Sequence, residues 1–116
     1  MTRTIVYFTD STGFGGAEQA LLNLMRALDR SQWQPVLIHY AAAGVQPLVS
    51  AAHQMGVETM VAAPMPEGRG LIAIPRFIRQ LRALRPAVFH ANLTWQLSCQ
   101  YGLLAAALAR VPAVIA

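Results

Sequence analysis

The chain has 116 residues, the size of one domain, and only 12% of them are charged, against about 25% in an average soluble domain. A surface this poor in charge is expected to contact another domain, a partner or a membrane. All of the positive charge behind the net +4 is arginine, because the sequence contains no lysine, and this excludes a Schiff-base lysine or a phosphate-loop lysine.

Composition also argues against a disulfide or zinc-cluster protein, a nucleic-acid-binding protein and a secreted protein. Cys99 is the single cysteine, so an internal disulfide is impossible, a zinc cluster is not expected and a reducing compartment fits. The arginines are spread along the chain, which argues against a nucleic-acid partner. No secretory leader is expected, because Arg3 precedes a strand-like run that ends at Asp10.

Short apolar runs alternate with helical patterns along the chain. Strands are expected at residues 4–9, 35–40, 57–62, 87–91 and 113–116. Helices are expected over residues 17–29, 45–55 and 95–110, with another entered near Pro75 and closed by Pro86. The first helix should bury one face, made by Leu21, Leu24, Met25 and Leu28. Gly56 is placed as the stop of the second helix.

This alternation predicts an α/β fold with a doubly wound parallel sheet, because strands separated by single helices are joined by right-handed crossovers. The expected strand order is 3-2-1-4-5, Rossmann-like, in one domain over residues 1–116. In this order the carboxyl ends of strands 1 and 4 lie side by side, where open α/β sheets bind ligands.

The turn between the first strand and the first helix contains three glycines. A helix start offers free N–H groups and the positive end of its dipole, and Gly15 and Gly16 would let a phosphate or sugar approach the backbone. The alternative is that the glycines only make a tight turn. The dinucleotide fingerprint fails, because Glu18 stands at its third glycine and His39 and Tyr40 stand where an acid is expected.

Polar residues also follow the fourth strand. His90, Asn92 and Thr94 are placed to hydrogen-bond a polyhydroxylated ligand in the cleft. For His90 a structural role within the fold remains the alternative.

The third helix combines an apolar arc with a basic one. Phe77, Ile78, Leu81 and Leu84 form the apolar arc, and Arg76, Arg79, Arg82 and Arg85 form the basic one. The basic arc is either a solvated helix face or a surface for anionic lipid.

The segments "GFGGAEQALLNLMRAL" and "RPAVFHANLTWQLSCQYGLLAAALARVPAVIA" resemble the N-terminal domain of the family 4 GT-B glycosyltransferases. That resemblance covers essentially the whole chain. It implies the acceptor-side half of a bacterial-type, retaining hexosyltransferase that uses a nucleotide-diphosphate sugar, with no tightly bound cofactor and no metal. The donor-binding C-terminal domain is expected to be a separate, missing half, so that this chain, which ends within a strand, should not transfer sugar alone.

The same resemblance assigns roles to individual residues. Gly15 and Gly16 match the loop that approaches the diphosphate and sugar of the donor, Glu18 matches the acid of the GGAE motif, and His90 matches the first histidine of an H-x-H motif. Glu18 also stands in the first turn of a helix, where the dipole alone favours a carboxylate. Ala87 replaces the aspartate of the family, and Asn92 replaces a second histidine.

The partners implied are the missing domain and a sugar, lipid-linked or small-molecule acceptor, in the cytoplasm or at the inner face of the membrane. The competing function is a stand-alone α/β module that binds a small anion or an anionic membrane without catalysis. A second domain with paired glutamates would favour the transferase.

Overall fold

A five-stranded parallel sheet forms the centre of the computed structural model, which describes residues 2–62, 70–93 and 98–116. The strands are β1 (Arg3–Phe8), β2 (Trp33–His39), β3 (Glu58–Val61), β4 (Val88–Ala91) and β5 (Ala113–Ile115). Their spatial order is β3-β2-β1-β4-β5. This is the predicted Rossmann-like order, with β1 between β2 and β4.

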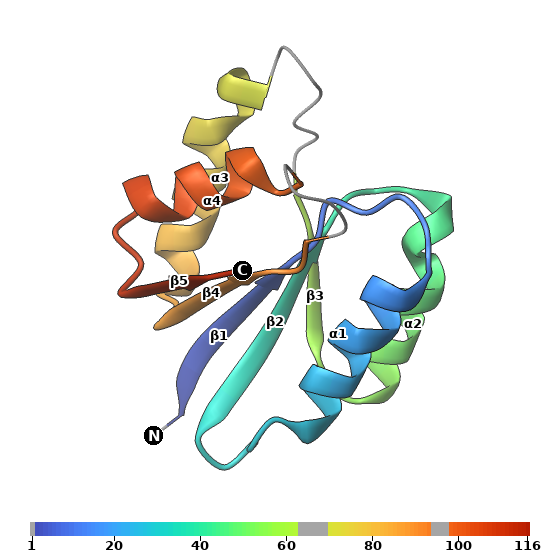
Figure 1. Ribbon diagram of the computed structural model, residues 1–116. Coiled ribbons are helices and arrows are strands. Elements are labelled where there is room, and N and C mark those ends of the chain that lie inside the picture. The colour runs from blue at the N-terminus through green and yellow to red at the C-terminus, as the bar shows by residue number, and fades with distance from the viewer. Residues whose placement is uncertain (1, 63–69, 94–97) are drawn as a thin grey trace.

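Helices cover both faces of the sheet (Figure 1). They are α1 (Gly16–Ala27), α2 (Gln46–Gln54), α3 (Gly70–Leu84) and α4 (Gln100–Leu108), with a short 3-10 turn, η1 (Ala43–Val45), before α2. Figure 1 shows α1 and α2 on one face and α3 and α4 on the other. The alternation of side chains along β1 divides the core accordingly: Ile5 and Tyr7 pack towards α1 and α2, and Val6 and Phe8 towards α3 and α4.

Two sequence expectations are wrong in detail. α3 begins at Gly70 and continues through Pro75, because Ile74 and Phe77 on either side of the proline are buried and their burial offsets the hydrogen bond that proline cannot donate. In α1, Leu24 is exposed and the buried face consists of Glu18, Leu21, Leu22 and Met25.

The helix stops follow local rules. Gly56 has φ +76°, and the N–H groups of Gly56 and Val57 donate to the carbonyls of His53 and Ala52. That pattern is the glycine stop predicted from the sequence. The expected start of the fourth helix at residue 95 lies outside the described residues, and the described helix ends at Leu108 rather than Arg110.

Candidate functional site at the carboxyl edge of the sheet

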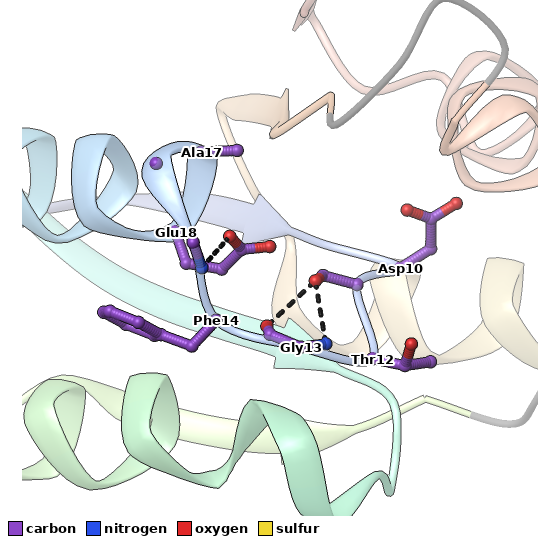
Figure 2. Close-up of a pocket in the computed structure, with 9 residues that line it drawn as sticks. Asp10, Thr12, Gly13, Phe14, Ala17 and Glu18 are labelled. Carbon is purple, nitrogen blue, oxygen red and sulfur yellow. Dashed lines mark hydrogen bonds between the residues drawn. The ribbon is translucent and has the colours of Figure 1, made fainter.

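The loop between β1 and α1 surrounds a hollow of about 520 Å³, lined by residues 10–18 (Figure 2). It brings together Gly15, Gly16 and Glu18, three of the residues singled out in the sequence. The hollow lies at the carboxyl edge of the sheet, beside β1. The strand order switches direction between β1 and β4, because the chain adds β2 and β3 on one side of β1 and β4 and β5 on the other.

Short side-chain hydrogen bonds hold this loop in shape. The Ser11 hydroxyl donates to the Gly13 carbonyl at 3.0 Å and accepts from the Gly13 N–H at 3.2 Å. Glu18 Oε2 accepts from the Gly15 N–H at 2.8 Å. Figure 2 shows these bonds as dashed lines and Glu18 folded back over the start of the helix. Residues of the loop thus hydrogen-bond to one another along its length.

Glu18 is almost fully buried, with 4% of its surface exposed. Burial raises the pKa of this carboxyl group, but interactions with the Ser11 hydroxyl and with the N–H groups of Gly15 and Glu18 outweigh burial and bring the pKa below its ordinary value. Glu18 is therefore ionised at neutral pH. Its geometry is that of a helix-capping carboxylate, which is the second of the two roles considered from the sequence.

The glycines of the loop are not required by backbone conformation. Gly13, Gly15 and Gly16 have no φ in the left-handed region, and a Cβ added at Gly13 or Gly16 would meet no atom within 4 Å. At Gly15 the nearest atom would be Glu18 Oε2, at an ordinary 3.7 Å. A tight turn alone would tolerate larger residues here, so the missing side chains leave room on the solvent side of the loop.

A different glycine supports the loop from behind. Gly44, in η1, faces the carbonyl group of Thr12 so closely that a Cβ would overlap its oxygen. Only glycine allows this approach, which presses the β2–α2 connection against the β1–α1 loop. Gly44 could not be predicted as a supporting residue, because nothing in its local sequence pattern indicates the contact.

Asp10 was noted in the sequence only as the residue that ends a strand. Its Oδ2 accepts a hydrogen bond of 2.8 Å from the N–H of Cys99, the residue that precedes α4 and has φ +61°. Figure 2 shows its carboxylate directed away from the loop backbone. The carboxylate thus joins the β1–α1 loop to the start of α4, where the helix dipole favours a negative charge. The available sequence signal was an acid placed directly after a buried strand.

Asn92 provides a second link across the same edge. Asn92 is buried, and its side-chain amide donates a hydrogen bond to the Ala17 carbonyl at 3.1 Å. The backbone carbonyl of Asn92 accepts a hydrogen bond from the Cys99 thiol at 3.6 Å. The amide group is therefore used to hold the end of β4 against the first turn of α1. Thr94, expected beside it, lies outside the described residues.

His90 lies within β4, and it does not line the hollow. Its ring is half-buried and packs against the ring of Tyr7, with centroids 5.4 Å apart. Burial lowers the pKa of His90 below its ordinary value, so the imidazole is neutral at pH 7. A neutral imidazole has one nitrogen that donates a hydrogen bond and one that accepts.

The basic arc of α3 is exposed, as the sequence predicted: Arg76, Arg79, Arg82 and Arg85 all face solvent, while Phe77 and Leu81 are buried. Among the described residues, no helix combines the length and the apolar character that are needed to cross a bilayer. In the same part of the chain, no group of three His, Cys, Asp or Glu side chains is placed to hold a metal ion. The expectation that no metal is required stays a prediction.

The fold is that of a doubly wound α/β domain, and the candidate ligand site is the glycine-rich loop at the start of α1. Residues 15–116 match the family described as "Glycosyl transferase 4-like domain", and the chain belongs to this family. Comparison with curated protein sequences gives no significant match.

A solved structure with the same fold is that of Anabaena Alr3699/HepE, determined in complex with UDP and glucose. The two chains are 20% identical and superpose with a TM-score of 0.69, over 97% of the present chain and 29% of the Anabaena chain. The present chain thus spans less than a third of that protein. The resemblance to the GT-B glycosyltransferases is confirmed by the family match and by this fold.

Proposed function

We propose that this domain is the acceptor-side, N-terminal half of a retaining glycosyltransferase, which moves a hexosyl group from a nucleotide-diphosphate sugar to an acceptor. The observation that carries the proposal is the hollow at the start of α1, where Gly16 offers open space instead of a side chain. Family membership and the UDP and glucose bound by the Anabaena protein support the same conclusion.

The start of α1 suits the charged part of such a donor. The N–H groups of Gly16 and Ala17 have no hydrogen-bond acceptor among the described residues, since the first N–H groups of a helix lack partners within it. Together with the helix dipole they favour a phosphate or sugar oxygen in the hollow. Glu18 and Asn92 then act as positioning residues, because their side chains are already bonded to the Gly15 N–H and the Ala17 carbonyl.

On the acceptor side, His90 and Thr94 are proposed as hydrogen-bonding residues. A neutral His90 ring would bind a sugar hydroxyl without adding charge beside the transferred group. The separate donor domain would supply the contacts that stabilise the departing diphosphate, so the domain alone should show no transfer. Turnover of a nucleotide sugar by the isolated domain, above a heat-inactivated control, would contradict the requirement for a separate donor domain.

The main test is Gly16→Val in the full-length enzyme. A Cβ added at Gly16 meets no atom within 4 Å, so we expect the fold to persist while the valine side chain occupies the space proposed for the donor. A penalty of about 1.4 kcal/mol in the transition state lowers kcat/KM about tenfold, and we expect at least this loss. Ala27→Val, which adds the same branched side chain at an exposed position at the other end of α1, should leave activity within about twofold.

Circular dichroism and thermal unfolding of both variants establish that the comparison concerns folded enzyme. If folded Gly16→Val retained the activity of Ala27→Val, the hollow would not hold the donor and the proposal would fail.

The exposed basic arc of α3 favours a lipid-linked acceptor at the inner face of the membrane. Each arginine near an anionic surface contributes roughly 1 kcal/mol, and this attraction is screened by salt. Sedimentation with anionic but not with neutral vesicles, reversed at high salt, is the expected result. Equal sedimentation with both kinds of vesicle would instead point to a soluble acceptor in the cytoplasm.

A further inference from the structure

A second hollow, of about 310 Å³, lies at the opposite edge of the sheet from the β1–α1 loop. There α3 and α4, which pack against each other, end beside each other before the chain enters β4 and β5 (Figure 1). It is lined by Leu81, Arg82, Arg85, Pro86, Ala109, Arg110, Val111 and Pro112. The ends of two helices thus contribute three arginines, Arg82, Arg85 and Arg110. This hollow is called the arginine hollow below.

No acidic residue lines the arginine hollow. None of its three guanidinium groups has a hydrogen-bond or ion-pair partner in the part of the chain that the structure describes. The described carboxylates are placed elsewhere: Asp10 on Cys99, Glu18 on Gly15, Asp29 on Ser31, and Glu58 beside a separate hollow. Three like charges therefore share one concave surface, and no carboxylate among the described residues pairs with them.

Within the described residues, none of the three guanidinium groups is hydrogen-bonded to a carbonyl at these helix ends. The N–H groups of Arg85 and Arg110 donate to the carbonyls of Leu81 and Ala107, each at 3.1 Å, and the Val111 N–H donates to Ala106 at 3.2 Å. These carbonyls of Leu81, Ala106 and Ala107 are thus satisfied by backbone groups rather than by arginine side chains. The guanidinium groups remain available for another ligand.

The backbone at two of the three positions is unfavourable for a residue with a side chain. Arg85 has φ +50° and Arg110 has φ +61°, and the described residues contain one other non-glycine residue with positive φ, Cys99. Glycine adopts this conformation at less cost, as Gly56 does at the end of α2. Local backbone preference therefore does not account for arginine at these helix ends.

We propose that the arginine hollow binds a phosphate-bearing anion. The guanidinium group presents a planar fork of donors that matches phosphate oxygens, and three such groups can surround one phosphate from different sides. Buried Leu81 and Pro86 form part of the lining, and the three exposed arginines are accessible to a ligand from solvent. The ligand is either a soluble phosphate compound or the phosphate of a lipid headgroup, and the two sources share this chemistry.

The test uses the full-length protein, with inorganic pyrophosphate measured by calorimetry at low salt as the soluble probe. Arg110→Gln removes one charge from the arginine hollow and keeps a long polar side chain on the same backbone. We expect this substitution to weaken pyrophosphate binding about tenfold. Arg26→Gln removes the same charge from an exposed position on α1, outside both the arginine hollow and the basic arc of α3, and it should leave the affinity unchanged.

Phosphatidylglycerol vesicles provide the second arm, with the same two variants. Binding that Arg110→Gln weakens and Arg26→Gln does not supports the proposal with either probe, and the probe that binds identifies the source. Equal losses in both variants would indicate diffuse attraction to a basic surface and overturn it. Absence of binding with both probes would also overturn the proposal. So would pyrophosphate binding that is abolished by Gly16→Val and unaffected by Arg110→Gln, because the anion would then bind at the β1–α1 loop.

Discussion

Replacing Gly102 by alanine tests how closely α4 packs on the sheet. Gly102 lies in α4 and faces the ring of Phe8, and an added Cβ would overlap this ring, with Cδ2 at 2.7 Å and Cζ at 3.2 Å. Alanine is favoured over glycine in a helix interior by about 1 kcal/mol. On propensity alone, Gly102→Ala would therefore stabilise the protein.

Packing should reverse this sign, because Phe8 cannot withdraw. The Phe8 ring is fully buried and packs against the rings of Phe77 at 5.1 Å, Phe89 at 5.8 Å and Tyr40 at 6.1 Å. Overpacking of a core costs about 1–3 kcal/mol, and overlap with a confined ring places this case in the upper part of that range. After subtraction of the propensity gain, we expect a net loss of about 1–2 kcal/mol.

Urea denaturation followed by circular dichroism measures this loss as a lower midpoint at an unchanged slope. Gly16→Ala is the matched control, since its Cβ meets no atom within 4 Å, and it should be neutral or stabilising. Phe8→Leu in the Gly102→Ala background should recover part of the overlap cost, which a double-mutant cycle isolates. If Gly102→Ala were as stable as the parent protein or more stable, the inferred contact between α4 and Phe8 would be wrong.

Two further predictions concern titratable groups. Because the pKa of Glu18 is lower in the folded state than its ordinary 4.5, its contribution to stability is fully present above 4.5 and is lost as the pH falls through the folded-state value. Glu18→Gln should therefore cost about 1 kcal/mol at pH 7, and urea midpoints of parent and variant should converge in acid; a pH-independent difference would contradict the capping role. Burial raises the pKa of Cys99 to about 12, so iodoacetamide at pH 8 should alkylate the thiol only slowly in the folded protein and rapidly in urea, with labelling followed by mass spectrometry. Native-state alkylation at the urea rate would refute the buried position of this thiol.

The alternation of strands and helices was visible in the sequence because it depends on local patterns. Short β-branched runs, helical spacing and the single glycine at position 56 each act within a few residues. Parallel strands joined by right-handed crossovers leave few arrangements, and the predicted order was confirmed. The apolar arc of α3 was also found in this way, since Phe77 and Leu81 recur at helical spacing and are both buried.

Helix boundaries and faces were less predictable, because burial can override local preference. Pro75 predicted the start of α3, but burial of Ile74 and Phe77 extends the helix to Gly70. Leu24 fits an apolar helical face, but the orientation of α1 on the sheet leaves it exposed. In both cases the deciding contacts come from other elements of the fold.

At the candidate site, the sequence singled out the glycine loop as a candidate, and tertiary structure decided how the loop is held. Gly15, Gly16 and Glu18 were recognised because a strand, a glycine turn and a helix follow one another in the chain. The contact between Asp10 and Cys99 joins residues 89 positions apart.

Close contacts at glycines and the clustering of charged side chains also depend on the folded chain and cannot be read from local sequence. Gly44 and Gly102 are required by the approach of Thr12 and Phe8 from other elements, and Arg110 joins Arg82 and Arg85 only where two helices end together. Local sequence specifies which elements form, because their hydrogen bonds and side-chain periods are local. Which side chains meet depends on the packing of elements far apart in the chain, which only the folded structure determines.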